Sequence, residues 1–395
     1  MIKNAGSSAA ESKAYELHII HIITGLNTGG TEMALLRLLT ALRPPEYQHT
    51  VVALGPEAEL SGKIASLAEL HHLGMHAGRM TPLNLVRLRR IIRCHRPHVI
   101  QAWMYHANLM ATLAGWDLQV PVIWGIRQSL YDIAKEKRAT RLVIRANKWL
   151  SRKPARIIFN STVGANHHVE YGFSPTQVNV IPNGFDTNIF KRNRDAGLSL
   201  RKELGIEAET LVIGLVARYH PIKDHANFLR AASQFIASHL NAMFVLVGDG
   251  VDQSNLKLSG LIDELQLRSK VRLCGRLHDI PAVNNALDIA SSSSWGEGFS
   301  NAIAEAMACG TPCVATDVGD VCDIIGDTGI VVPPHDSVAL SNGWTKLAAL
   351  GAEGRRDLGE RARRRIIERY SLTSNAEQYT KLYTSLVKEK STCVA

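Results

Sequence analysis

The sequence alternates along almost its whole length between short apolar segments rich in β-branched residues and longer segments with apolar residues at helical spacing. Such alternation is typical of parallel β-sheets with helices on both faces. We predict strands at 17–23, 50–54, 99–103, 120–124, 157–160 and 178–181, and again at 211–216, 242–247, 271–274, 289–292, 313–315 and 330–332. Helices are predicted between them, among them 31–42, 84–94, 107–115, 226–238, 256–265 and 301–308. The sequence therefore predicts an α/β protein with two successive parallel sheets.

The length of 395 residues suits two domains better than one core. The turn at 182–186 (Pro-Asn-Gly-Phe-Asp), followed by the charged stretch 191–203, predicts the junction between them. We expect a flexible polar leader at 1–16 and Rossmann-like domains at 17–181 and 182–370, which face each other across a cleft. A final helix with a tail is expected at 371–395.

Membrane-spanning and secretory segments are not evident in the sequence. Apolar runs such as 17–23 are far shorter than the ~18 residues that span a bilayer, and the polar first 16 residues lack the apolar region of a signal peptide. The six cysteines form no Cys-x-x-Cys pair, which indicates reduced thiols. These features predict a cytoplasmic protein.

Basic residues are concentrated in the first half of the chain. Residues 1–180 contain 21 Lys and Arg against 11 Asp and Glu, whereas the remaining residues contain 24 against 25. The basic residues cluster in 87–96 and 135–156, where they mix with apolar residues at near-helical spacing. Two interpretations stay open. These helices lie on an anionic membrane surface, as a peripheral protein of the inner face of the cytoplasmic membrane would, or they pack on a sheet with solvated basic faces.

The segment 295–313 is the most specific motif of the chain, with Glu297 and Glu305 on either side of a predicted helix start. The helix is predicted to end at Gly310, ahead of Pro312. Because the first amides of a helix lack partners within it, the turn near Ser300 and Asn301 is a ready anion site. A retaining glycosidase would need two carboxyl groups about 5–5.5 Å apart. Eight residues of helix span roughly 12 Å, so the two glutamates do not fit that class of enzyme.

Further polar groups and glycines follow the predicted strands, and ligands of open α/β sheets bind beyond these strand ends. A forked guanidinium and a point charge together suit a diphosphate. Glycines before a helix start let a phosphate approach the backbone. The residues in question are Gly29 and Gly30 after 17–23, His106 after 99–103, Arg127 after 120–124, Arg218 and Lys223 after 211–216, Gly248 after 242–247 and Arg276 after 271–274.

The segment 295–313, together with Arg218 and Lys223, resembles the signature of retaining nucleotide-sugar glycosyltransferases of glycosyltransferase family 4, which have the GT-B architecture. The resemblance covers nearly the whole chain past the leader. It implies two Rossmann-like domains, with the acceptor side at 17–181, the nucleotide-sugar side at 182–370, and a last helix that crosses back to the first domain.

The resemblance also implies roles for individual residues. Glu297 would contact the donor sugar and Glu305 the ribose, while Arg218 and Lys223 would hold the diphosphate. Gly29 and Gly30 would close on the diphosphate, and His106 would lie near the anomeric carbon. The other donor-binding residues would be Gly248, Arg276, Gly298, Phe299, Ser300 and Asn301.

We therefore expect a retaining transferase that moves a hexose or N-acetylhexosamine from a nucleotide diphosphate sugar, UDP by family preference, to a growing glycan. An acceptor on a polyprenyl diphosphate would fit the basic first half, although a soluble acceptor also fits. Arg127 is interpreted either as a contact to an anionic acceptor or phosphate, or as a structural group. Asn183 is interpreted as structural. No Asp-x-Asp and no His, Cys or Asp cluster with ligand spacing is evident, so no metal or other cofactor is expected.

Three alternatives stay open beside this interpretation. A nucleotide-sugar epimerase or a phosphorylase of the same architecture would need no glycan acceptor, and no pyridoxal lysine is identifiable for a phosphorylase. A non-catalytic binder of nucleotide sugars or glycans would share the site. A nucleic-acid partner is suggested only by the isoelectric point near 9.3. It is not expected, because no binding motif accompanies the charge.

Overall fold

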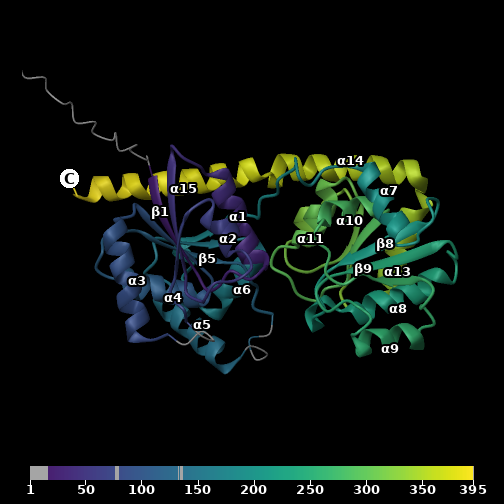
Figure 1. Cartoon of the computed structure of the whole chain (residues 1–395), viewed down its shortest axis with the longest axis horizontal. Coiled ribbons are helices and arrows are strands. Elements are labelled where there is room, and N and C mark those ends of the chain that lie inside the picture. Colours follow the sequence, from purple (N-terminus) through teal and green to yellow (C-terminus); the bar gives the residue numbers. More distant parts are fainter. Residues whose placement is uncertain (1–16, 76–79, 132, 134–136, 395) are drawn as a thin grey trace, which may run out of the picture. The chain divides into compact units, whose positions relative to one another are not determined.

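The computed structural model describes residues 17–75, 80–131, 133 and 137–394 (Figure 1). The predicted leader at 1–16 and Lys135 of the second basic segment lie outside the described residues. The chain divides into two compact units. The first consists of Met1–Gly125, Lys153–Ala155 and Tyr383–Ala395, and the second of Ile126–Arg152 and Arg156–Leu382.

The first sheet has seven parallel strands in the order β3-β2-β1-β4-β5-β6-β7. Their bounds are β1 Leu17–Ile23, β2 Tyr47–Ala53, β3 Glu69–His72, β4 Val99–Trp103, β5 Val122–Ile126, β6 Arg156–Phe159 and β7 Val178–Val180. β1 is fully buried and pairs with β2 through Ile20↔Thr50 and with β4 through Ile20↔Ile100. The helices in this part of the chain are α1 Gly30–Ala41, α2 Ser61–Ala65, α3 Pro82–His95, α4 Tyr105–Gly115, α5 Arg138–Leu150 and α6 Thr162–Tyr171.

The second sheet has six parallel strands in the order β10-β9-β8-β11-β12-β13. Their bounds are β8 Leu211–Val216, β9 Ala242–Val247, β10 Val271–Leu273, β11 Ile289–Ser292, β12 Cys313–Thr316 and β13 Ile330–Val332. The remaining helices are α7 Arg194–Glu203, α8 His225–Ile236, α9 Leu256–Glu264, α10 Ile280–Ala286, α11 Asn301–Ala308, α12 Val321–Ile325, α13 Ser337–Ala349, α14 Gly351–Tyr370 and α15 Leu372–Val394. The predicted α/β class with two parallel sheets is confirmed.

Both sheets follow the same doubly wound plan, in which the strand order reverses beside the first strand of the sheet. The reversal lies between β1 and β4 in the first sheet and between β8 and β11 in the second. A crevice forms at this point because the two connections leave toward opposite faces of the sheet, and ligands bind there at the carboxyl ends of the strands. The plan therefore marks two places, one in each sheet, where site residues are expected.

The core of the second unit consists of two apolar layers, one on each face of the sheet. Helices α8, α9 and α13 cover one face, and α7, α10 and α11 lie on the other (Figure 1). Trp344 of α13 is fully buried, and its ring lies 5.0 Å from that of Phe228 and 5.8 Å from that of Phe244. Burial of such large rings is the main stabilising contribution in this layer.

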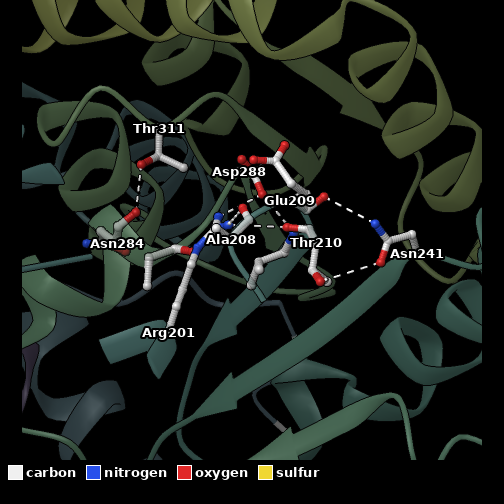
Figure 2. Close-up of polar contacts among 10 residues, drawn as sticks. Arg201, Ala208, Glu209, Thr210, Asn241, Asn284, Asp288 and Thr311 are labelled. Atoms are coloured by element: carbon white, nitrogen blue, oxygen red, sulfur yellow. Dashed lines mark hydrogen bonds and ion pairs between the residues drawn. The ribbon is translucent and has the colours of Figure 1, made fainter. Parts of the chain in front are cut away.

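An ion pair between Arg201 and Asp288 lies at the amino ends of β8 and β11 (Figure 2). Asp288 Oδ2 accepts from Arg201 Nη2 at 2.7 Å and from the backbone N–H of Val212 at 2.8 Å. The guanidinium also donates to three backbone carbonyl oxygens, those of Ala286 (2.8 Å), Ala208 (3.2 Å) and Thr210 (3.2 Å). The hydrogen bonds of this ion pair are thus satisfied by the protein itself, and its role is structural.

Some elements differ from the sequence predictions. The strand β3 and the helix α14 were not anticipated, and the charged stretch predicted as part of the interdomain junction forms α7 from Arg194. The last helix continues to Val394. In the described part of the chain, no helix is both long enough and apolar enough to cross a membrane.

Candidate active site

An ion pair between Lys223 and Glu297 lies beyond the carboxyl ends of β8 and β11. Lys223 Nζ donates to Glu297 Oε1, and the hydroxyl of Ser294 donates to the same oxygen at 2.8 Å. The side chain of Lys223 is 23% exposed and that of Glu297 is 13% exposed, so both groups remain accessible from one side. The two residues predicted to act on a donor are therefore neighbours at the switch point of the second sheet.

The loops that hold this pair are fastened to each other by hydrogen bonds. Ser293 Oγ donates to the carbonyl oxygen of Lys223 at 2.8 Å. The backbone N–H of Trp295 donates to the Ile222 carbonyl oxygen at 3.0 Å, and its indole N–H donates to that of Pro221 at 2.9 Å. The loop after β8 and the loop after β11 thus form one unit that fixes the positions of Lys223 and Glu297.

Positive charge accumulates after β8. Arg218 is exposed at the strand end, and the one-turn helix Pro221–Lys223 brings Lys223 next to the same loop. Partial burial, together with the charges of Arg218 and Lys223, lowers the pKa of His220 below its usual value. The positive charges of Arg218 and Lys223 that disfavour protonation of His220 also favour the binding of an anion such as a diphosphate.

The loops after β9 and β10 lie against the Arg218 loop. The backbone N–H of Gly248 donates to the Gly275 carbonyl oxygen at 2.8 Å, and the N–H of Tyr219 donates to that of Asp249 at 2.7 Å. A Cβ on Gly248 would lie 2.1 Å from the carbonyl oxygen of Ala217, so only glycine allows this approach. The structure thus brings the predicted Gly248 next to the Arg218 loop, and Arg276 follows Gly275 as an exposed residue.

Helix α11 starts directly after the Glu297 turn. Its N-cap residue Ser300 forms no side-chain cap, which leaves first-turn amides for an anion. Asn301 and Glu305 are one turn apart on the same face of α11, and both are half-buried. The turn is anchored by Phe299, which is 6% exposed and follows the predicted Gly298. Its ring packs against those of Phe185 at 5.9 Å and Tyr370 at 5.5 Å.

Asn183 links Arg127 to the start of α11. Arg127 Nη1 donates to Asn183 Oδ1, and Nη2 donates to the hydroxyl oxygen of Tyr379 at 3.0 Å. The side-chain amide of Asn183 donates to Asn301 Oδ1 at 2.7 Å, and Asn183 is 4% exposed. These contacts agree with the structural interpretation of Asn183 and place Arg127 in a network that holds α11. A contact of Arg127 with a phosphate or acceptor stays a prediction.

The turn after β12 also belongs to this site, although it was not predicted from the sequence. Asp320 accepts hydrogen bonds from the Ser161 hydroxyl at 2.9 Å and from the backbone N–H groups of Thr162 at 2.8 Å and Val163 at 3.0 Å, at the start of α6. A Cβ on Gly319, whose φ is 56°, would lie 2.3 Å from the Gly298 carbonyl oxygen. Its position in the sequence could have revealed this turn, because it follows β12 at the carboxyl end of the strand, as the other loops of the site follow their strands.

The remaining predicted residues, Gly29, Gly30 and His106, lie in the first unit, at the switch point of the first sheet. Gly29 is the N-cap of α1 and has extended backbone, with Gly30 as the first helical residue. The carboxylate of Glu32 lies against this turn, since a Cβ on Gly29 would be 2.5 Å from Glu32 Oε2. Burial raises the pKa of Glu32. The side chain of Glu32 therefore occupies part of the space next to the first-turn amides of α1, where an anion could bind.

His106 is the second residue of α4, at the carboxyl end of β4. It follows Met104, whose φ of 71° is strained for a residue with a side chain. The N–H of Met104 donates to the carbonyl oxygen of Gly125 at 2.7 Å, which holds the turn. Burial lowers the pKa of His106, so its imidazole is neutral near pH 7 and can accept a hydrogen bond. The predicted role of His106 near the anomeric carbon stays a prediction.

Known proteins resemble the chain in both sequence and fold. Residues 28–189 match the family model described as Glycosyltransferase Family 4, and residues 210–349 match the model described as Glycosyl transferases group 1. Together the two matches include all the residues predicted at the two switch points.

Among curated relatives, an Escherichia coli UDP-Gal:α-D-GlcNAc-diphosphoundecaprenol α-1,3-galactosyltransferase is 23% identical over 78% of this chain and 80% of its own length. The putative glycosyltransferase EpsF of Bacillus subtilis is 26% identical over 76% of this chain and 79% of its own. Among solved structures, Anabaena HepE in complex with UDP superposes with a TM-score of 0.81 at 21% identity, over 93% of this chain and 100% of that one. The chain belongs to the glycosyltransferase family 4 type of enzymes and has their GT-B architecture.

Proposed function

We propose that this chain is a retaining glycosyltransferase that moves a hexose or N-acetylhexosamine from a UDP-sugar to a growing glycan in polysaccharide synthesis. The observation that carries the proposal is the Lys223–Glu297 pair at the switch point of the second sheet, directly ahead of α11. The name of the Escherichia coli relative gives a UDP-galactose donor, and HepE was solved with UDP, so both support a UDP-sugar donor here.

The proposed donor places its diphosphate between Arg218, Lys223 and the start of α11. Negative charge grows on this leaving group as the anomeric bond breaks, and fixed cations and helix amides stabilise that state more than the bound donor. The diphosphate would compete with Glu297 for the ammonium group of Lys223, which frees Glu297 to accept from sugar hydroxyls. Glu305, one turn into α11, would accept from the ribose diol. Since these groups supply the positive charge, we propose that transfer requires no divalent metal.

Retention is proposed to occur by displacement on the same face of the sugar. In this reaction the acceptor hydroxyl attacks the anomeric carbon from the side of the leaving diphosphate. The oxygen of the departing phosphate takes the acceptor's proton. The neutral His106 would contribute an acceptor near the oxocarbenium-like centre, and closure over the donor would exclude water.

The acceptor is proposed to be lipid-linked, with the chain held peripherally on the inner face of the cytoplasmic membrane. The name of the Escherichia coli relative gives a diphosphoundecaprenol-linked acceptor, which supports this choice. Helix α5 exposes 85% of Trp149 and 65% of Leu142, and its Arg138 and Arg145 are also exposed. Apolar and basic groups on the surface of one helix suit an anionic membrane. Sedimentation with anionic vesicles is expected to weaken in a Leu142→Ser/Trp149→Ser variant, and unchanged binding would point to a soluble acceptor.

The test of the transferase is release of nucleotide from a panel of UDP-, GDP- and ADP-sugars without acceptor, with and without EDTA. Wild-type protein is expected to release UDP slowly from one UDP-sugar, unaffected by EDTA, and Lys223→Ala and Glu297→Gln are expected to abolish the release. Lys257→Ala and Glu264→Gln serve as matched controls, because both residues are exposed on or beside α9 and lie outside the proposed site. With a lipid-linked acceptor, NMR of the product should show the anomeric configuration of the donor.

Other outcomes would favour the alternative functions. Conversion of a UDP-sugar to its epimer would identify an epimerase. Tight UDP-sugar binding without any turnover, with or without acceptor, would identify a binding protein.

A further inference from the structure

Three side chains of metal-ligating type meet at the edge of the first sheet, away from its switch point. They are Glu69 and His71 of the edge strand β3 and His95, the last residue of α3. His71 Nε2 lies 3.0 Å from Glu69 Oε1, and His95 Nε2 lies 3.5 Å from the same oxygen. Neighbours two apart on a strand face the same side, which explains why Glu69 and His71 converge while His72 does not join them. His95 arrives from 24 residues further along the chain only because α3 ends beside β3.

The spacing of these atoms matches the first coordination sphere of a small transition-metal ion. With metal–ligand distances of about 2.0–2.2 Å, ligands of a tetrahedral zinc ion lie roughly 3.4 Å apart. The distances of 3.0 Å and 3.5 Å to Glu69 Oε1 lie on either side of this value, and the three ligand atoms lie within 4.8 Å of one another. Two imidazoles and one carboxylate form a donor set typical of zinc with one open position for water. Hard cations such as magnesium prefer oxygen ligands and fit this donor set poorly.

The surroundings of the cluster hold it in place and favour a cation. His95 is the last residue of α3, and the partial negative charge at the C-terminal end of a helix favours a nearby cation, although Arg93 in the same turn offsets part of it. The ring of His18 packs edge-on against that of His95 at 5.8 Å, and His18 Nε2 lies 3.0 Å from the Thr50 hydroxyl. His98 fixes the backbone of His18 through its Nδ1 at 2.9 Å. The side chains of His95 and His71 are 19% and 33% exposed, so packing restricts both imidazoles, while that of Glu69 is 51% exposed and open to solvent.

We propose that Glu69, His71 and His95 bind one zinc ion, with water as the fourth ligand, and that this ion ties the edge strand β3 to the end of α3. The site is structural and is independent of the transfer reaction, since its ligands lie at the far edge of the first sheet from β4 and His106. Closure of the 24-residue connection between His71 and His95 by a metal removes conformational freedom from the unfolded chain and stabilises the folded one.

The test is equilibrium titration of zinc, with a competing chelator, into full-length protein that carries no histidine tag and has been stripped of metal. We expect one zinc ion per chain and a rise in melting temperature when zinc is added. Each of Glu69→Gln, His71→Asn and His95→Gln is expected to weaken zinc binding at least tenfold, because each removes a ligand. His72→Asn is the matched control, since it removes a neighbouring imidazole from the same strand without removing a ligand. Cobalt as a replacement ion should give the visible absorption of tetrahedral coordination in wild type and in His72→Asn only.

Equal zinc affinity in wild type and the three ligand variants would overturn the proposal, as would an equal loss in His72→Asn. Wild-type protein that binds less than one zinc ion per chain would also overturn it. Circular dichroism of each metal-free variant confirms that a loss of binding is not a loss of fold. Conservative replacement of half-exposed side chains at a sheet edge should preserve the fold.

Discussion

Two ion pairs link the segments next to β8 and β11, one at each end of these strands. They differ in the further hydrogen bonds that their charged groups form. At the amino ends, Arg201 donates to three backbone carbonyl oxygens besides Asp288, and Asp288 accepts a backbone N–H (Figure 2). At the carboxyl ends, the described hydrogen bonds of the Glu297 carboxylate are to two side chains, those of Lys223 and Ser294, both through one oxygen. A charge pair saturated by backbone is part of the scaffold, whereas one held by side chains alone can exchange partners with a ligand. The comparison therefore separates a structural pair from the pair that we propose to be catalytic within a single sheet.

The largest effect is expected at the carboxyl-end pair. Replacement of Lys223 by Ala should lower kcat/KM by about 10²–10³, the usual cost of removing one group that stabilises developing charge. The melting temperature should change little, because the pair is partly exposed and the described hydrogen bonds of its two charged groups involve no backbone atom. Steady-state kinetics and thermal melts of the same preparation measure both. A large loss of stability with unchanged kinetics would reverse the comparison.

The amino-end pair should respond in the opposite way. Asp288→Ala leaves Arg201, whose side chain is 10% exposed, without its counter-charge. Removal of one partner of such a pair is expected to lower the free energy of unfolding by about 3 kcal/mol. Urea denaturation measures the loss, and kcat/KM per folded molecule should stay within a factor of two of wild type. A drop in activity comparable to that of Lys223→Ala would show that the two pairs are not functionally distinct.

The free energy of unfolding should fall in acid, because the folded state contains buried histidines that are neutral. Burial lowers the pKa of His49, His168 and His225 to about 4, below the value of 6.5 in the unfolded chain. The unfolded state then binds more protons, so stability is full above pH 6.5 and falls as the pH drops from 6.5 toward 4. Urea midpoints between pH 7.5 and 4.5 measure this slope.

One of these histidines can be removed without loss of its hydrogen bond. His168 Nδ1 lies 2.7 Å from the carbonyl oxygen of Gly164. His168→Gln retains a donor and should flatten the dependence of stability on pH. An unchanged slope in this variant would assign the acid effect to other groups.

The smallest of these effects is expected from Ser294→Ala. The hydroxyl of Ser294 donates to Glu297 at 2.8 Å, and hydrogen bonds to charged groups contribute about 1.5–3 kcal/mol. Since Glu297 keeps Lys223, we expect a roughly tenfold loss of kcat/KM from the lower end of this range. Ser341→Ala is the control, because Ser341 is also buried, lies in α13 and has no contact with Glu297 or Ser294 among those described. Equal losses in the two variants would mean that Ser294 acts through packing alone.

The prediction from sequence was most successful where a local pattern determines the structure. Helix α11 has the predicted bounds 301–308, because a Gly-bounded turn precedes it and Gly310-Thr-Pro follows it. The neighbouring positions of Lys223 and Glu297 followed from the strand-end rule applied to β8 and β11. Both inferences use short stretches of chain together with one topological rule.

Other features depend on contacts that no local pattern reveals. Strand β3 has four half-buried or exposed residues and is recognisable only by its pairing with β2. Helix α14 contains seven arginines but also three glycines, which lower its intrinsic helix propensity. One of them, Gly359, lies so close to Gly310 that a Cβ would be 2.0 Å from its carbonyl oxygen, so helix packing selects glycine there. Arg201 and Asp288 are 87 positions apart in the sequence, and Glu69 and His95 are 26 positions apart. Sequence spacing alone cannot show that such distant residues are in contact.

The central claim is that the carboxyl-end pair, and not the amino-end pair, belongs to a nucleotide-sugar site. Calorimetric titration of UDP into wild type, Lys223→Ala, Asp288→Asn and the surface control Lys257→Ala tests it most directly. The account predicts one UDP per chain in wild type, Asp288→Asn and Lys257→Ala with similar affinity, and at least tenfold weaker binding in Lys223→Ala. Equal affinity in all four proteins, or no UDP binding by folded wild-type protein, would contradict it.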